Sequence, residues 1–160
     1  MNVGTAVISG NLTDLGVILS VNLNFCKLFK LEKNDILKNS VNNIIPYYIS
    51  QFHESFIKRY FNTAVKNVLD VDRILFGLKS TGFLVPVILH TKIIPNLDQS
   101  IRFIGYMKKI EKIHNFFKSR LNPANFQTAF LLVNNEGSVF GISKTVYNNN
   151  FRLVYYSVYL

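Results

Sequence analysis

Histidines are the residues of this chain with the clearest capacity for chemistry, because a neutral imidazole can bind a metal ion or accept a proton. The three histidines, His53, His90 and His114, fall on three different predicted elements. The chain has no H-E-x-x-H pair, no cysteine beside a histidine and no glycine-rich phosphate loop. An enzyme needs a nucleophile with its base, a carboxylate pair or metal ligands that converge. We therefore expect no catalytic residues here and no enzyme.

The single cysteine, Cys26 in the segment NFCKLF, points to a reducing compartment. It has no partner for an intramolecular disulfide and is expected to be a buried small apolar residue. The first basic residue is Lys27, so the start lacks the charged region of a signal peptide. No apolar run approaches the ~18 residues that cross a bilayer. We expect an intracellular location on the cytoplasmic side, either alone or within a membrane-associated protein.

The charge balance of the chain favours acidic partners. Lys and Arg number 18 against 9 for Asp and Glu, a net charge of +9, while 49% of the 160 residues are hydrophobic, enough for a sizeable core. The basic residues lie between apolar positions, as do Lys27, Lys30, Lys33, Lys38, Lys108, Lys109, Lys112 and Lys118. The aromatic residues near them follow apolar stripes rather than stacking platforms. A nucleic-acid partner is disfavoured, since no recognition motif accompanies the charge.

Apolar, β-branched runs predict five strands in the first two thirds of the chain. Residues 5–10 and 16–22 form an opening hairpin around a turn rich in Asn, Asp and Gly. Three consecutive antiparallel strands are expected at 73–79, 83–94 and 100–110, the first two joined by the tight turn Ser80-Thr81-Gly82.

Helices are expected between the two groups of strands and after the last one. Short helices occupy residues 24–50, with Asn34 or Asp35 placed to cap a start. Gln51 to Val68 reads as a longer helix, with Phe52, Phe56, Tyr60 and Ala64 at intervals of four. A second amphipathic stripe, spaced 3, 4, 3, 4, comprises Met107, Ile110, His114, Phe117 and Leu121. It predicts a linker helix over residues 107–122 that packs on the first domain or on a dimer mate.

The C-terminal segment repeats the layout of the opening hairpin. TAFLLVNNEGSVFGIS at 128–143 matches TAVISGNLTDLGVILS at 5–20 with a turn two residues shorter, and a last strand-like run follows in NNNFRLVYYSVYL. An isolated hairpin is marginal in water and an uncovered edge invites pairing. We expect the hairpin to dock on the first domain, to pair across a dimer or to pack in a larger assembly.

The order of these elements and three sequence segments resemble the PAS domain family. The segments are DLGVILSVN-x-x-F, IIP-x-x-x-x-x-x-H-x-x-F-I-x-x-Y and R-x-L-F-G-L-K-S-T-G-F-L-V-P-V-I-L, within residues 4–110. In style the chain is similar to PAS modules of large protozoan proteins. The resemblance implies an α+β fold with a five-stranded antiparallel sheet, short helices over one face, and a sensory or protein-interaction role rather than catalysis. The domains expected are a PAS-like domain at 1–106, the linker helix at 107–122 and a partial second PAS-like repeat at 123–160.

Within this family, His53 and Arg73 are similar in placement to the helix histidine and strand arginine of heme-based gas sensors. That comparison gives an alternative reading: a heme sensor with His53 as axial ligand and Arg73 on the distal side. Thr91 departs from it, because those sensors carry an apolar residue there. A histidine at this position also packs or bonds a nearby loop in members without heme, and this structural role is preferred. The candidate pocket comprises His53, Ile57, Val68, Arg73, Leu89 and Thr91.

The expected partners follow from the same comparison. A protein partner or a second copy of the chain is expected to contact the outer face of the sheet and the linker helix. The interaction residues expected on that helix are Met107, Ile110, Ile113, Phe117 and Leu121. A small apolar ligand or heme is the candidate ligand, and no cofactor is required. The flavin-binding Asn-Cys-Arg-Phe core is not present in the long helix, so a flavin photosensor is disfavoured. A second alternative is a basic adaptor that binds anionic lipid or nucleic acid.

Overall fold

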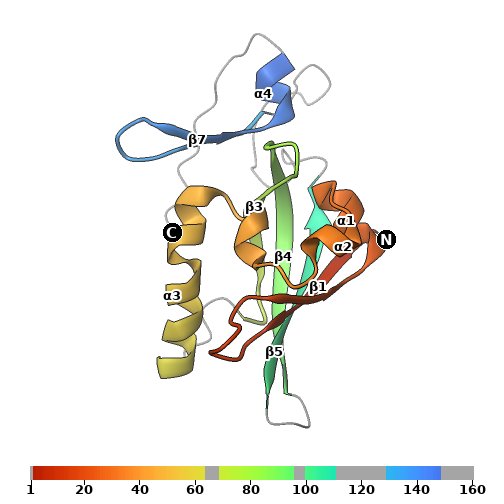
Figure 1. Cartoon of the computed structure of the whole chain (residues 1–160). Helices are drawn as coiled ribbons and strands as arrows, with labels where there is room; N and C mark the ends of the chain where they lie inside the picture. The colour runs from red at the N-terminus through yellow and green to blue at the C-terminus, as the bar shows by residue number, and fades with distance from the viewer. Residues whose placement is uncertain (1, 64–68, 96–99, 111–128, 149–160) are drawn as a thin grey trace.

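A five-stranded antiparallel sheet, covered on one face by helices, forms the body of the molecule (Figure 1). The computed structural model describes residues 2–63, 69–95, 100–110 and 129–148. The strand order is β2-β1-β5-β4-β3, so the chain's last strand of this sheet lies between the first and the fourth. Residues 131–142 add a separate two-stranded sheet. The expected α+β architecture is confirmed.

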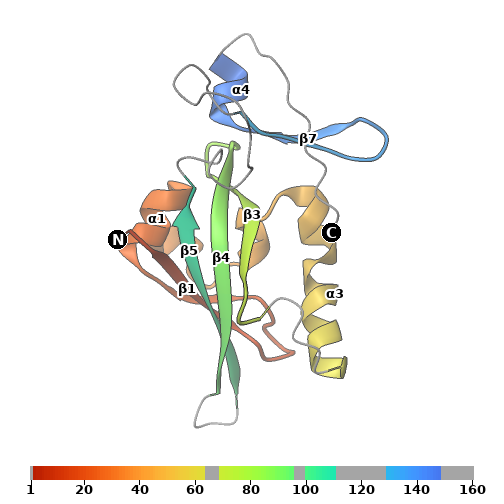
Figure 2. The same ribbon diagram turned by 180° about the vertical axis from the view of Figure 1, so that it is seen from behind.

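The five predicted strands are confirmed, and the predicted and observed strand ends differ by no more than two residues. They are β1 (Gly4–Ser9), β2 (Ile18–Val21), β3 (Asp72–Leu78), β4 (Leu84–Pro95) and β5 (Ile101–Lys109). The β3–β4 turn closes where Gly82 N–H donates to the carbonyl of Lys79 at 2.8 Å. Figure 2 shows β1, β5, β4 and β3 side by side from behind, with the long helix beyond the β3 edge.

The helices between β2 and β3 are α1 (Leu23–Phe29), α2 (Lys33–Ile36), the 3-10 turn η1 (Val41–Ile44) and α3 (Tyr47–Thr63). The expected cap at Asn34 or Asp35 is wrong, because both lie inside α2 and its N-cap residue is Glu32. The side-chain cap belongs to Asn22, whose Oδ1 accepts from Phe25 N–H at 2.9 Å. Helix α3 begins four residues before the predicted start, directly after Pro46, a residue suited to a helix start.

The core lies between the sheet and the segment from α1 to η1. Phe25 and Phe29 are almost completely buried and their rings pack 4.8 Å apart. Gly77 in β3 permits this packing, since a Cβ there would lie 2.4 Å from Cε1 of Phe29. Cys26 is 7% exposed within the same cluster, which confirms its expected role as a buried apolar residue. The apolar core thus lies mainly between α1 and the strands β1, β2, β4 and β5.

The expected helix start at Met107 is wrong. Strand β5 continues to Lys109, and Met107 pairs with Gly4 on one side and Leu89 on the other. Ile110 follows the strand, with its N–H donating to the carbonyl of Pro86 at 3.1 Å. Both side chains are buried, so they stabilise the domain instead of forming a surface stripe, and the first domain extends beyond residue 106. Of the five stripe residues, Met107 lies in β5 and Ile110 directly after it, so the 3, 4, 3, 4 spacing does not mark a helix start at Met107.

The second hairpin consists of β6 (Leu131–Val133) and β7 (Val139–Ile142), followed by α4 (Lys144–Asn148). Of the three expected placements, the structure shows docking on the first domain. Ser143 forms a parallel bridge with Leu84, and the rings of Phe130 and Phe76 lie 5.3 Å apart. Gly141 allows the close approach, because a Cβ there would lie 2.9 Å from the Leu84 side chain. The strand-like run predicted after residue 148 and the linker residues 111–122 lie outside the described residues.

Candidate ligand site on the helical face of the sheet

His53 projects from the second turn of α3 and is held by a neighbouring element. Its Nδ1 donates to Oδ1 of Asn42 in η1, at 3.1 Å. Burial lowers the pKa of His53, so the neutral ring is favoured at physiological pH. With Nδ1 protonated, the lone pair lies on Nε2. The bond joins α3 to η1 and leaves Nε2 without a partner requirement from Asn42, so it fits both readings of His53.

The strand residues of the candidate pocket share the helical face of the sheet. Arg73 stands directly across from Leu89, which packs against the core. Thr91 follows two positions later on β4, opposite Gly105, and is therefore on the same face. Its carbonyl accepts from Asp70 N–H at 2.9 Å. Ile57 is half-buried one turn after His53 on α3, and Val68 lies outside the described residues.

Helix α3 packs loosely for a helix that covers a sheet. None of its 17 residues is fully buried, and Phe52 and Phe56 are each 48% exposed. Its contact with the sheet includes its C-terminal half, where the rings of Tyr60 and Phe61 lie 6.4 and 6.0 Å from that of Phe103. At its N-terminal end, the ring of Tyr48 lies 4.8 Å from that of Phe140 in the second hairpin. The helix is thus supported near its two ends.

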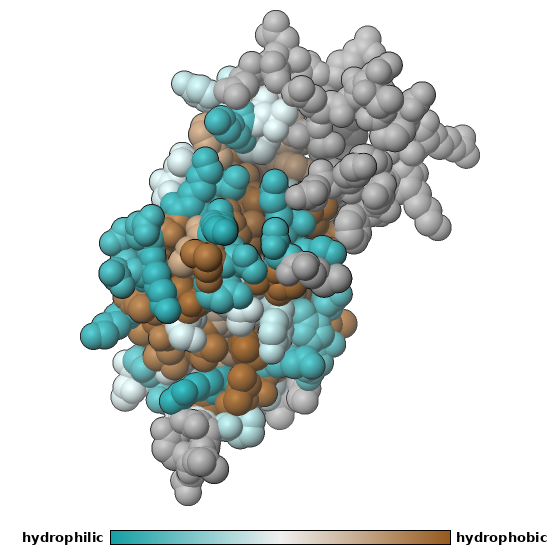
Figure 3. Space-filling view, turned by 90° about the vertical axis from the view of Figure 1, so that its right-hand side faces the viewer, coloured by the Kyte–Doolittle hydropathy of each residue, from teal (hydrophilic) through white to brown (hydrophobic). Residues whose placement is uncertain are grey.

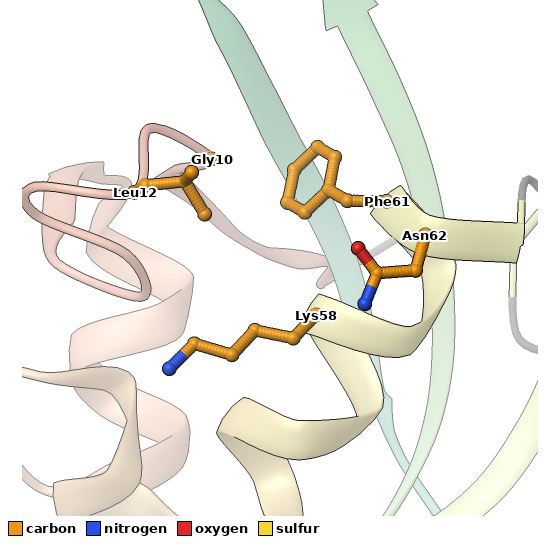
Figure 4. Close-up of a pocket in the computed structure, with 5 residues that line it drawn as sticks. All are labelled: Gly10, Leu12, Lys58, Phe61 and Asn62. Atoms are coloured by element: carbon orange, nitrogen blue, oxygen red, sulfur yellow. The ribbon is translucent and has the colours of Figure 1, made fainter.

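An open hollow of about 300 Å³ lies between α3 and the β1–β2 turn (Figure 4). Gly10 and Leu12 line it from the turn, and Lys58, Phe61 and Asn62 line it from the helix. Lys58 also pairs with Glu54 at 2.6 Å. His53 is not among the lining residues, so this space is separate from the predicted pocket. The volume is at the lower end of the range for small-molecule sites.

The outer face of the sheet carries the other described histidine. Nδ1 of His90 lies 2.8 Å from Oδ1 of Asp72, its cross-strand neighbour. Tyr106 stands across from His90 on β5 and is 37% exposed. His114 lies outside the described residues. Within the described part of the chain, no three His, Cys, Asp or Glu side chains gather in a way that could hold a metal ion.

Two asparagines that organise these elements were not predicted from the sequence. Asn22 accepts from Thr5 N–H at 2.9 Å in addition to capping α1, and its amide donates to the carbonyl of Val3 at 2.9 Å. It therefore joins β1, β2 and α1 through one side chain. Asn42 orients His53. An asparagine immediately before a helix-like run is a capping signal, which was available for Asn22. No local signal connects Asn42 with His53, eleven residues later.

No protein-family model matches the chain. Among curated proteins, a probable serine/threonine-protein kinase of Dictyostelium discoideum is 27% identical over 99 residues, which make up 62% of this chain and 6% of the kinase. The matched part is thus a small fraction of that relative.

Solved PAS domains share the fold of the chain. A PAS domain of a Colwellia psychrerythraea protein matches with a TM-score of 0.54 at 18% identity, covering 70% of this chain and 89% of that one. The PAS domain of an HTR-like protein from Haloarcula marismortui gives 0.50 at 18% identity, covering 68% and 86%. A Rhodobacter sphaeroides LOV protein gives 0.53 at 11% identity, covering 71% and 62%. The chain therefore has a PAS fold. No helix among the described residues is long and apolar enough to span a bilayer.

Proposed function

We propose that this PAS-fold chain is a sensory or protein-interaction module, without catalytic activity of its own, within a larger signalling or structural assembly. The observation that carries the proposal is the uneven helical cover of the sheet. Helix α1 and the turn after it supply the buried core, whereas α3 contributes no fully buried residue. Elements with little buried apolar area change their packing at low energetic cost. Helix α3 is the element that a bound ligand or partner would move.

The candidate pocket for a small apolar ligand lies between α3 and the sheet. Ile57 and Leu89 would supply apolar contacts, and Thr91 and Arg73 polar ones, from the positions described above. Val68 is proposed as a further lining residue of the same pocket. No cofactor is needed for this role. The kinase relative supports a modular arrangement, because the matched segment is 6% of its length.

Association with a second copy of the chain, or with another protein, is proposed to use the outer face of the sheet and the stripe Ile113, Phe117 and Leu121. Half-buried Ile74, Ile88 and Ile104 make the outer face partly apolar. Ile74 and Ile88 are cross-strand neighbours, and exposed apolar patches of this kind mark interaction surfaces.

Size-exclusion chromatography with light scattering tests the association. We expect the wild type to dimerise or to recover a partner from cell extract, and the double variant Ile113→Asp, Phe117→Asp to lose that species. Lys118→Asp, which lies off the stripe, is the matched control and should behave as the wild type. Monomers in every case, with no partner recovered, would contradict an interaction role.

Heme binding is the second candidate function, favoured by the bond between His53 and Asn42. A partner on Nδ1 fixes the tautomer that offers Nε2 to iron, as outer-shell partners of metal-bound histidines do. Heme would supply gas or redox sensing at that atom. An absorbance scan after reconstitution with hemin is the test. A Soret band that is lost in His53→Ala supports heme, and no band removes it.

A further inference from the structure

Four lysines from separate parts of the sequence lie near the end of the sheet where β3 and β5 finish and β4 begins. Figure 1 shows this end of β4 at the top, below α4. The four lysines are Lys30 at the C-cap of α1, Lys79 after β3, Lys109 at the end of β5 and Lys144 at the start of α4. We call them the lysine cluster. Only Lys79 is half-buried, and the others are exposed.

Backbone contacts hold the lysine cluster together. Strands β3 and β5 both run antiparallel to β4, so their C-terminal ends lie at the same end of the sheet. Lys79 and Lys109 lie at these two strand ends, and Lys109 stands across from Val87. The β3–β4 turn is tied to α1, because Ser80 N–H donates to the carbonyl of Phe29 at 3.0 Å and Ser80 Oγ donates to that of Lys30.

The second hairpin supplies the fourth lysine. Ser143 bridges Leu84 at the start of β4, and Lys144 follows it directly. The ring of Tyr147 in α4 lies 5.8 Å from that of Phe83, the residue whose carbonyl accepts from Lys79 N–H at 3.0 Å. Docking of the hairpin therefore completes the lysine cluster.

The positive charges of the lysine cluster are not neutralised by the described residues. Among the described residues, Glu54 pairs with Lys58 on α3 and Asp72 lies against His90 on the sheet, and none of the four lysines pairs with a described carboxylate. Burial lowers the pKa of Lys79, and the ammonium groups of Lys109, Lys30 and Lys144 lower it further. Like charges held close together repel one another, and a bound anion would relieve this repulsion.

Lys30 adds a second cost at the same place. Its φ of 56° is in the left-handed region, at a helix C-terminus where glycine is the preferred residue. A non-glycine residue in this conformation is strained, and strain of this kind gathers at functional sites. Lys38, with φ of 63°, has the same conformation outside the lysine cluster.

We propose that the lysine cluster binds a compact polyphosphate, that is, two or more phosphate groups on one small molecule or on one lipid head group. A lysine ammonium binds phosphate as a point charge with three donors. Four of them, on four segments around one sheet end, suit a ligand with several negative charges close together better than a single carboxylate. The lysine cluster is distinct from the candidate pocket between α3 and the sheet. Anion binding at the cluster can therefore be tested separately from ligand binding in the pocket.

Isothermal titration with inositol hexakisphosphate at near-physiological salt tests the proposal. We expect saturable binding with one molecule per chain, weakened about fivefold by loss of each lysine of the cluster. Lys30→Gly is the key variant and Lys38→Gly its matched control, since both remove one charge and relieve the same backbone conformation. Lys30→Gly should weaken binding and Lys38→Gly should not. An equal loss in both would mean that the binding reflects net charge alone and would overturn the proposal.

Thermal unfolding separates the binding effect from misfolding. Without ligand, Lys30→Gly and Lys79→Met should unfold at the wild-type temperature or higher, because strain or repulsion is removed. Added hexakisphosphate should raise the midpoint of the wild type more than that of either variant. A variant that loses binding because it is destabilised would show the opposite shift in its unliganded midpoint, and that result would contradict the assignment.

Vesicles identify the source of the phosphate. Binding to vesicles that contain a doubly phosphorylated phosphoinositide, displaced by soluble hexakisphosphate and absent with phosphatidylserine at equal surface charge, supports a lipid head group. Binding of the soluble probe without vesicle binding supports a free polyphosphate. Equal binding to both vesicle types, with none to the soluble probe, would overturn the proposal in favour of unspecific attraction to an anionic surface.

Discussion

The two halves of the helical cover differ in how completely their side chains are buried. In the half from α1 to η1, Phe25, Phe29, Val41 and Ile44 are all buried against the sheet. In the other half, α3 is longer than α1, α2 and η1, yet it buries no residue fully and leaves two phenylalanines half exposed. Figure 3 shows hydrophobic patches between hydrophilic side chains even on the side of α1 and α2. The first half therefore provides stability, and the second keeps apolar surface available.

Replacing one phenylalanine in each half gives the largest expected contrast. Phe25→Ala empties a fully buried position and should lower the free energy of unfolding by about 3–5 kcal/mol. Phe56→Ala, at a position that is 48% exposed, should cost about 0.5 kcal/mol or less. Urea unfolding of both variants measures the difference. Similar losses would show that α3 packs as firmly as α1.

Replacing the asparagine that organises each half should give a smaller contrast. Asn22→Ala removes the α1 cap and the bonds to β1, and should cost about 2 kcal/mol. Asn42→Ala removes one bond to a half-buried imidazole and should cost about 1 kcal/mol or less. Chemical denaturation again gives the values. A larger loss at Asn42 than at Asn22 would reverse the comparison.

Hydrogen exchange tests whether the second hairpin supports the loose half. Phe140 packs on Tyr48 at the start of α3, and Ser143 bridges β4. Amides of residues 130–133 and 139–142 should therefore be protected, although less than those of β4 and β5. The central strands of the same sample are the internal control. Exchange as fast as in a free peptide would show that the hairpin is an unfolded remnant.

The smallest effect concerns pH and His53. Because burial lowers its pKa in the folded state, the unfolded chain takes up the proton first as the pH falls. Stability from this group is complete above the unfolded pKa of about 6.5 and declines as the pH drops below it. Melting temperatures between pH 7.5 and 5 should show this slope in the wild type and not in His53→Gln. The same slope in both would assign it to other groups.

The sequence predicts the sheet better than the sites. Alternating apolar residues fix where β4 and β5 run, because burial of one face is a local pattern. The prediction failed at Met107, because Met107 and Ile110 are three residues apart and fit a helical stripe, whereas Met107 faces the core from β5 and Ile110 is buried just after the strand. The lysine cluster and the bond between Asn42 and His53 depend on contacts between segments far apart in the chain, and Lys79 and Lys144 have no local signal at all. Such convergence follows from topology and is visible only once the strand order is known.

The hydrogen bond from Ile110 N–H to the carbonyl of Pro86 connects the lysine cluster with the end of β5. This bond is formed one residue after Lys109 and continues the pairing between the end of β5 and the start of β4. Loss of this bond would free the end of β5 and so alter the spacing between Lys109 and Lys79. By reciprocity, an anion that binds better when the bond is formed would stabilise the bond by the same free energy. Binding at the proposed anion site and pairing at the end of β5 would therefore be coupled.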